Sequence, residues 1–147
     1  MEKNRIRKFN NAAFFDSAKQ NGYTSTDTAI CEIIDNSVES YDEIANKNGL
    51  IEIITIEARG SNGREKIVEI IVADAAGGMS EEVLQKALAM GQGTKSDVAT
   101  TKSNRKLGKF GMGLLNSSIS QCDRVEVYSW QKKDELFMSY EDLEEYR

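Results

Sequence analysis

The run from Thr28 to Ile44 contains neither glycine nor proline and has the periodicity of an amphipathic helix. At about 100° per residue, its side chains divide into two opposite stripes. The apolar stripe consists of Ile30, Ile33, Ile34, Val38 and Tyr41, and the polar stripe of Glu32, Asp35, Asn36 and Glu39. We therefore expect a helix that buries its apolar face.

The polar stripe brings three carboxylates and one amide into a common space. Carboxylates that lie close together repel one another unless a cation or a hydrogen-bond donor compensates their charge. A bound metal ion, or a water molecule that requires activation, would explain the cluster. The alternative is that these charges form the solvated face of an ordinary amphipathic helix.

The composition is that of one globular domain. With 147 residues, of which 39% are hydrophobic and 29% charged, the chain is long enough for its own core. We expect a single domain over residues 1–147, either complete in itself or forming the N-terminal part of a longer protein. The net charge of −5 argues against a nucleic-acid surface that spans the domain, and the lack of histidine excludes His-based catalysis within the chain.

Neither a membrane span nor a secretory signal is expected, because no long apolar run is present and the basic N-terminus leads into no apolar segment. The two cysteines, Cys31 and Cys122, lack the paired spacing of a zinc site. We expect them to be buried, reduced thiols in a cytoplasmic protein, and the alternative is a disulfide.

The rest of the chain predicts helices and strands in mixed order. Helices are expected over 10–20, from the cap at 24–27 to about 47, and over 80–89 and 111–120; strands are expected over 50–58, 66–73, 124–130 and 136–140. The first two strands flank a glycine-containing turn, which is typical of a hairpin. This order predicts an α+β fold, a two-layer α/β sandwich with helices on one face of a mixed, mostly antiparallel sheet.

A second constellation follows the second predicted strand, in which we expect residues 70–73 to be buried. There, Asp74 is followed by two alanines, Gly77, Gly78 and Met79. A carboxylate at a strand end can accept a hydrogen bond from an exocyclic amine such as that of adenine, while small residues and Met79 can line a flat ligand. The alternative is a plain strand-to-helix turn that uses glycine for its positive φ.

The third constellation consists of Gly108, Gly111 and Gly113, directly before a predicted helix. Backbone N–H groups at the positive end of a helix dipole form a phosphate cradle, and Lys106 and Lys109 could add charge-assisted contacts. The preceding segment, residues 91–108, is a long polar loop, a kind that is usually functional or mobile. The spacing matches neither a P-loop nor a dinucleotide-binding turn.

Taken together, the three constellations resemble the motifs of the GHKL ATPase superfamily, which includes DNA gyrase, the ninety-kilodalton heat-shock chaperone, MutL and the histidine kinases. The first motif, Glu-x-x-Asp-Asn-x-x-Asp/Glu, is matched by Glu32, Asp35, Asn36 and Glu39; the second, Asp-x-Gly-x-Gly, by Asp74 and Gly78; the third, Gly-x-x-Gly-x-Gly, by Gly108, Gly111 and Gly113. The resemblance covers roughly residues 25–130 and is greatest to the MutL and MORC-like branch. It implies a Bergerat-type ATP-binding fold with an ATP lid over about residues 91–108.

The resemblance also implies roles for individual residues. Glu32 would orient and deprotonate the attacking water, and Asn36 would hold Mg²⁺. Asp74 would read the adenine amino group. The full set of implied nucleotide-binding residues is Asp35, Asn36, Asp74, Gly78, Met79, Lys95, Gly108, Lys109, Phe110, Gly111, Met112 and Gly113.

The implied function is an ATP-binding module with slow, Mg²⁺-dependent hydrolysis to ADP, working as a nucleotide-controlled conformational switch. ATP would order the lid and present a surface to a partner protein or to a second copy. DNA association would follow only from family analogy. The alternatives are a protein kinase of the histidine-kinase or anti-sigma serine-kinase type and a non-catalytic nucleotide-sensing domain. The chain departs from the family pattern at Ala75, Ala76 and Leu115, where related members carry Asn, Gly and Lys.

Overall fold

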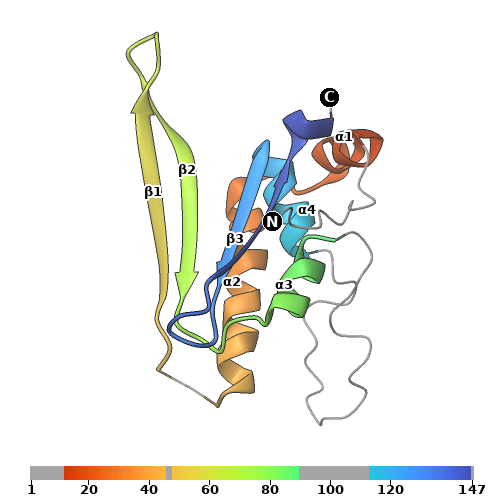
Figure 1. Cartoon of the computed structure of the whole chain (residues 1–147). Helices are drawn as coiled ribbons and strands as arrows, with labels where there is room; N and C mark the ends of the chain where they lie inside the picture. Colours follow the sequence, from red (N-terminus) through yellow and green to blue (C-terminus); the bar gives the residue numbers. More distant parts are fainter. Residues whose placement is uncertain (1–11, 46–47, 90–112, 147) are drawn as a thin grey trace.

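The computed structural model describes residues 12–45, 48–89 and 113–146 (Figure 1). In chain order the elements are α1 (Ala12–Asn21), α2 (Thr26–Glu43), β1 (Ile51–Arg59), β2 (Glu65–Asp74), α3 (Glu81–Ala87), α4 (Gly113–Gln121), β3 (Arg124–Ser129), β4 (Phe137–Asp142) and the 3-10 helix η1 (Leu143–Tyr146). Helices combined with antiparallel strands confirm the α+β fold class. None of the helices in these ranges is long and apolar enough to cross a membrane.

The described strands form two antiparallel pairs, β1–β2 and β3–β4. In the first pair, Ile51 lies opposite Asp74 at the base of the hairpin, and Arg59 lies opposite Glu65 near its tip. β-branched residues favour these strands, and Gly63 at the tip adopts a φ of 75°, which a glycine reaches without strain. This register places Asp74 at the end of the hairpin that leads toward α3.

The buried core lies where α1, α4, the end of α3 and η1 meet. Its members are Phe15, Leu88, Leu115, Ile119 and Leu143, and side chains of β3 pack against them. Leu115 is only 1% exposed. A lysine at this position would have to bury its charge, so position 115 serves the core and supplies no phosphate contact in this structure.

Helix α2 packs mainly on α4, and its C-terminal half reaches the base of the β1–β2 hairpin (Figure 1). The hydroxyl of Tyr41 donates to the carbonyl of Leu50 (2.7 Å) and accepts from the amide of Ala75 (2.8 Å). A Cβ atom added at Gly49 would lie 2.4 Å from the Tyr41 ring. The sequence predicted Tyr41 only as part of an apolar face. Its hydroxyl links α2 to Leu50, which precedes β1, and to Ala75, which follows β2.

Two expectations for this helix are wrong. Helix α2 ends at Glu43 instead of near residue 47, and Ala45 follows with a φ of 54°. Val38, assigned to the buried stripe, is 40% exposed. The physical reason is that α4 and the hairpin base cover only part of the apolar stripe.

The cysteines also differ from expectation. Both are free thiols, but Cys31 is exposed because it lies on a part of α2 that no described element covers. Cys122 is half-buried, its Sγ donates to the carbonyl of Ser118 (3.1 Å), and burial raises the pKa of its thiol.

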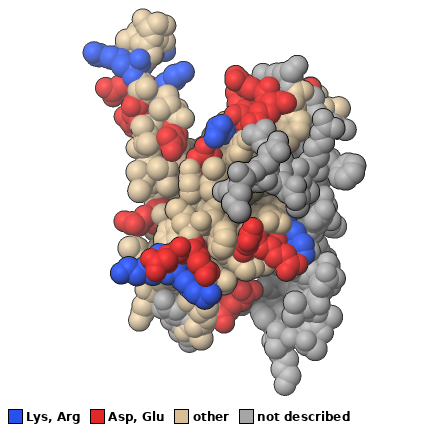
Figure 2. All heavy atoms as spheres, in the orientation of Figure 1, with Lys and Arg blue, Asp and Glu red and all other residues tan. Residues whose placement is uncertain are grey.

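The β1–β2 hairpin stands apart from the helices (Figure 1), and Figure 2 shows basic side chains near its tip and acidic side chains along its length. The Ile- and Val-rich pattern of β2 predicted a buried strand, which is wrong, because the long strands extend beyond the elements that contact their base. More than a third of each of the following side chains is exposed: Ile53, Ile54, Ile56, Ile67, Val68 and Ile71.

Candidate functional site

The carboxylate of Glu32 lies against the start of α4. A Cβ atom added at Gly113, the first residue of that helix, would lie 3.3 Å from Oε2 of Glu32. The N-terminus of a helix carries N–H groups without intrahelical partners and the positive end of the helix dipole. The fold thus brings Glu32 of the first motif next to Gly113 of the third motif. A helix N-terminus at this position favours the binding of anionic groups.

Tyr23 lies in the loop between α1 and α2, near Glu32. Burial, and after it the negative charge of Glu32, raises the pKa of the Tyr23 hydroxyl. The carbonyl of Tyr23 accepts a hydrogen bond of 2.9 Å from Nε2 of Gln121. The sequence analysis missed Tyr23, because it belongs to no motif and precedes the helix cap.

Asn36 lies on the exposed side of α2, one turn beyond Glu32. Its Nδ2 donates to the backbone carbonyl of Glu32 over 3.0 Å. This bond uses the amide nitrogen and leaves the amide oxygen, the atom type that suits a hard cation, for another partner. Asp35 is half-buried beside it on the polar stripe.

The donor set fits a magnesium ion that arrives with a nucleotide. Within residues 12–45, 48–89 and 113–146, no group of three or more His, Cys, Asp or Glu side chains could hold a metal ion unaided. Mg²⁺ usually takes one or two protein oxygens and completes its octahedral shell with phosphate oxygens and water. The amide oxygen of Asn36, which the sequence predicted as a metal ligand, is compatible with that smaller requirement.

Asp74 joins the end of β2 to α2. Its Oδ2 accepts from the hydroxyl of Ser37 (2.7 Å), and its Oδ1 accepts from the amide of Ala76 (3.0 Å). The carboxylate is therefore oriented from two sides, and its remaining lone pairs can accept an exocyclic amine. Ser37 is 6% exposed and was missed by the sequence analysis, although a serine one turn from Ile33 and Tyr41 is a polar residue within an apolar stripe.

The turn after Asp74 requires glycine at position 78. Gly78 has a φ of 63°, and a Cβ atom there would lie 2.2 Å from the carbonyl oxygen of Trp130. The next amide, of Met79, donates to the buried hydroxyl of Ser129 over 2.7 Å. The motif glycine therefore lets the turn approach the end of β3.

Alanine is compatible with the backbone at position 76. Ala45 is the one non-glycine residue with a positive φ in the described ranges, so Ala76 needs no glycine-like conformation. The departure from the family pattern at this position consequently introduces no backbone strain.

Several predicted site residues lie outside the described residues, as does the segment 91–108 that was predicted as the lid. They are Lys95, Gly108, Lys109, Phe110, Gly111 and Met112. Their roles stay predictions. The described part of the site consists of α2, the turn after Asp74 and Gly113.

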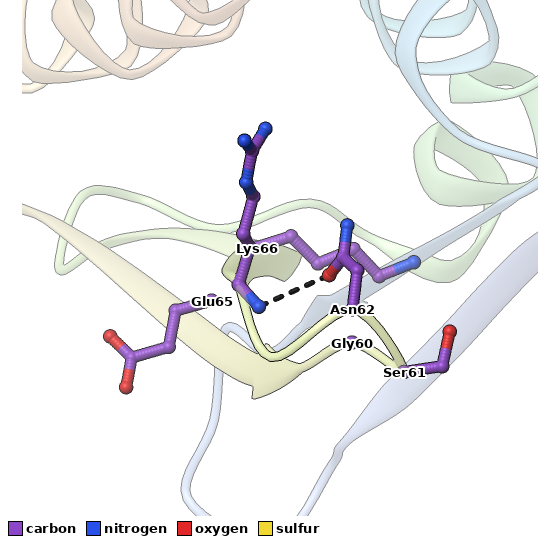
Figure 3. A pocket seen from close by; sticks show the side chains of 6 residues that line it. Gly60, Ser61, Asn62, Glu65 and Lys66 are labelled. Carbon is purple, nitrogen blue, oxygen red and sulfur yellow. Dashed lines mark hydrogen bonds between the residues drawn. The ribbon is translucent and has the colours of Figure 1, made fainter.

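A surface hollow at the tip of the β1–β2 hairpin is a different feature (Figure 3). It is lined by Gly60, Ser61, Asn62, Arg64, Glu65 and Lys66, and the amide of Arg64 donates to Oδ1 of Asn62 over 3.1 Å. The hollow lies at the opposite end of the hairpin from Asp74 and contains no residue of the three motifs. We therefore take the surface formed by α2, the turn after Asp74 and Gly113 as the candidate site.

The polar stripe of α2, a strand-end aspartate and a helix N-terminus, gathered on an α+β fold, are features from which a nucleotide-binding domain can be built. Residues 23–146 match the family model of histidine kinase-, DNA gyrase B- and HSP90-like ATPases. This match covers most of the chain, so the chain belongs to that family and is an ATP-binding module, as the three motifs predicted. A comparison with curated proteins gave no match.

Proposed function

We propose that this domain binds MgATP on the surface formed by α2, the Asp74 turn and the start of α4, and hydrolyses it slowly. The observation that carries the proposal is the position of the Glu32 carboxylate at the N-terminus of α4. Anionic phosphate oxygens are stabilised at such a terminus, so a water molecule next to a terminal phosphate would lie within reach of Glu32.

In this proposal two residues of α2 have separate tasks. Glu32 orients the attacking water and accepts its proton. Asn36 offers its amide oxygen to the metal, with its Nδ2 held by the carbonyl of Glu32. The magnesium ion supplies charge compensation for the phosphates.

Asp74 reads the base. Its carboxylate, held by Ser37 and by the amide of Ala76, accepts the adenine amino group. Guanine has a carbonyl oxygen at the equivalent position, which a carboxylate repels. We therefore expect the domain to prefer ATP to GTP by at least about tenfold, in keeping with a charge-assisted hydrogen bond.

Nucleotide binding would act as a switch. The support is the length and polarity of segment 91–108, which we propose to be the ATP lid of a single domain spanning residues 1–147. An ordered lid would favour a homodimer or a partner protein, and hydrolysis to ADP would release it. The residues of the first and third motifs favour the MutL and MORC-like branch of the family. Two free thiols favour the reducing cytoplasm as the compartment.

The test separates binding from turnover. Glu32→Ala should keep its MgATP affinity within about threefold in calorimetry and lose about 100-fold or more of its phosphate release, because a positioned base contributes on that scale. Glu43→Ala, an exposed glutamate at the end of the same helix, serves as the control and should match the wild type. Equal losses of binding and hydrolysis in Glu32→Ala would remove the base role.

A non-catalytic nucleotide sensor is the second candidate, and one observation favours it. Leu115 lies in the core, so the position where related members carry lysine provides no phosphate contact. Nucleotide binding without phosphate release, unchanged in Glu32→Ala, would support this alternative.

A further inference from the structure

The chain contains three Asn-Gly dipeptides, at residues 21–22, 48–49 and 62–63. An asparagine that precedes a glycine is especially prone to spontaneous deamidation, because glycine has no side chain to shield its backbone nitrogen from the amide carbon of the asparagine. The reaction requires the peptide between the two residues to rotate. The local fold therefore decides which of the three dipeptides reacts.

Two of the dipeptides lie in packed backbone. A Cβ atom added at Gly22 would lie 2.3 Å from the carbonyl oxygen of Ala18 and 2.8 Å from Cβ of Ser120. A Cβ atom added at Gly49 would lie 2.4 Å from the ring of Tyr41. Neither peptide can rotate without displacing its neighbours, so the fold protects both dipeptides.

The third dipeptide lies at the tip of the β1–β2 hairpin (Figure 3). Asn62 and Gly63 are exposed, and a Cβ atom added at Gly63 would meet nothing within 4 Å. The amide of Gly63 donates to the carbonyl of Gly60 over 2.9 Å, and this bond must open before the nitrogen can react. Opening costs little free energy here, because the tip lies at the far end of the hairpin from the elements that contact its base.

Two features of the tip favour the attack on the Asn62 side chain. The amide of Arg64 donates to Oδ1 of Asn62 over 3.1 Å, so a hydrogen-bond donor already faces the oxygen on which negative charge develops (Figure 3). Arg64 and Lys66 line the same hollow beside Glu65, which leaves a surplus of positive charge among the lining residues. Positive charge stabilises the deprotonated backbone amide, which is the attacking species.

We propose that Asn62 is a site of spontaneous deamidation and that the fold confines the reaction to the hairpin tip. The backbone nitrogen of Gly63 gives its proton to water and forms a bond to Cγ of Asn62. The bond from Cγ to the side-chain nitrogen breaks, and this nitrogen takes up a proton and leaves as ammonia. A water molecule then opens the cyclic imide at either carbonyl, so one amide and one water become one carboxylic acid, as aspartate or isoaspartate, and one ammonia.

The modification changes the tip in two ways. Either product places a carboxylate beside Arg64 and Lys66, where the unmodified chain has a neutral amide. Isoaspartate also lengthens the backbone within the turn, which the amide of Gly60 closes by donating to the carbonyl of Arg64 over 2.8 Å. The modified tip is therefore less basic and less regular than the original one.

Peptide mapping by mass spectrometry, after long incubation of the whole chain at mildly alkaline pH, measures all three sites in one sample. We expect Asn62 to deamidate at least about tenfold faster than Asn21 or Asn48, because the free energy of local opening enters each rate directly. In the urea-unfolded chain the three rates should agree within about threefold, since the packing that protects two of the sites is lost. An Asn62 that reacts no faster than the others in the folded protein, or a preference for Asn62 that persists after unfolding, would overturn the proposal.

Variants at the tip isolate the site and its activation. Asn62→Gln should abolish the anionic form that ion-exchange chromatography detects, because glutamine must close a larger ring that forms more slowly. Arg64→Ala keeps the backbone donor and should slow deamidation of Asn62 about twofold or more, as expected for the loss of one exposed charge. Lys133→Ala, at an exposed lysine between β3 and β4, should leave the rate unchanged.

Unfolding curves show whether each variant is folded. A folded Asn62→Gln chain that still produces the anionic form at the wild-type rate would place the reaction at another residue. An unchanged rate in Arg64→Ala would contradict the role assigned to the charge of the hollow.

Discussion

The helices, packed together with β3, form a body whose aliphatic side chains are buried, whereas the β1–β2 hairpin exposes side chains of the same kind. Ile119 of α4 is fully buried, whereas Ile54 and Ile67 of the hairpin are 46% and 52% exposed. Burial therefore stabilises the body, while the hairpin depends on its own ladder of hydrogen bonds and on its attachment at the base. The candidate site lies along this boundary, with Glu32 and Gly113 on the body and Asp74 at the hairpin base.

The largest expected effect is in the core. Ile119→Ala should lower the free energy of unfolding by about 2–5 kcal/mol, because it removes buried methyl groups and leaves a cavity. The matched change on the hairpin, Ile54→Ala, should cost less than about 1 kcal/mol, since that side chain is already half in water. Urea denaturation of both variants measures the contrast, and similar losses would mean that the hairpin is buried in solution.

The next largest effect concerns the turn that joins the two regions. Gly78→Ala should cost about 2–4 kcal/mol, because alanine is strained at positive φ and its Cβ would meet the carbonyl of Trp130. Gly77→Ala is the control: its Cβ would make an ordinary contact of 3.4 Å with Ile44. Thermal unfolding of Gly78→Ala and Gly77→Ala measures the difference. Equal stability of the two variants would contradict the positive φ and the close contact of Gly78 with Trp130.

A smaller effect is expected at Tyr41, which fastens α2 to the hairpin base. Tyr41→Phe leaves the amide of Ala75 and the carbonyl of Leu50 without their partner, at a cost of about 1–2 kcal/mol. Hydrogen exchange should accelerate at the base of the hairpin and stay unchanged in α4. Uniform acceleration across the domain would show that the two regions unfold as one unit.

Part of this picture follows from sequence patterns alone. Helical periodicity places Glu32 and Asn36 on one face of α2, and turn chemistry places Asp74 at a strand end, since both depend on near neighbours in the chain. The contacts of Ser37 with Asp74 and of Gln121 with Tyr23 could not be predicted, because they depend on how distant segments pack. The exposure of Ile71 was missed for the same reason: an apolar strand does not indicate what covers it.

Calorimetric titration with MgATP tests the central claim, that α2, the Asp74 turn and the start of α4 form one ATP site. The wild type should bind MgATP saturably, and Asp74→Ala should lose about tenfold or more in affinity, in keeping with a charge-assisted hydrogen bond. Asp134→Ala, at an exposed aspartate between β3 and β4, should bind like the wild type, and unfolding curves confirm that each variant is folded. No binding by the wild type at millimolar nucleotide, or full affinity in a folded Asp74→Ala variant, would contradict the account.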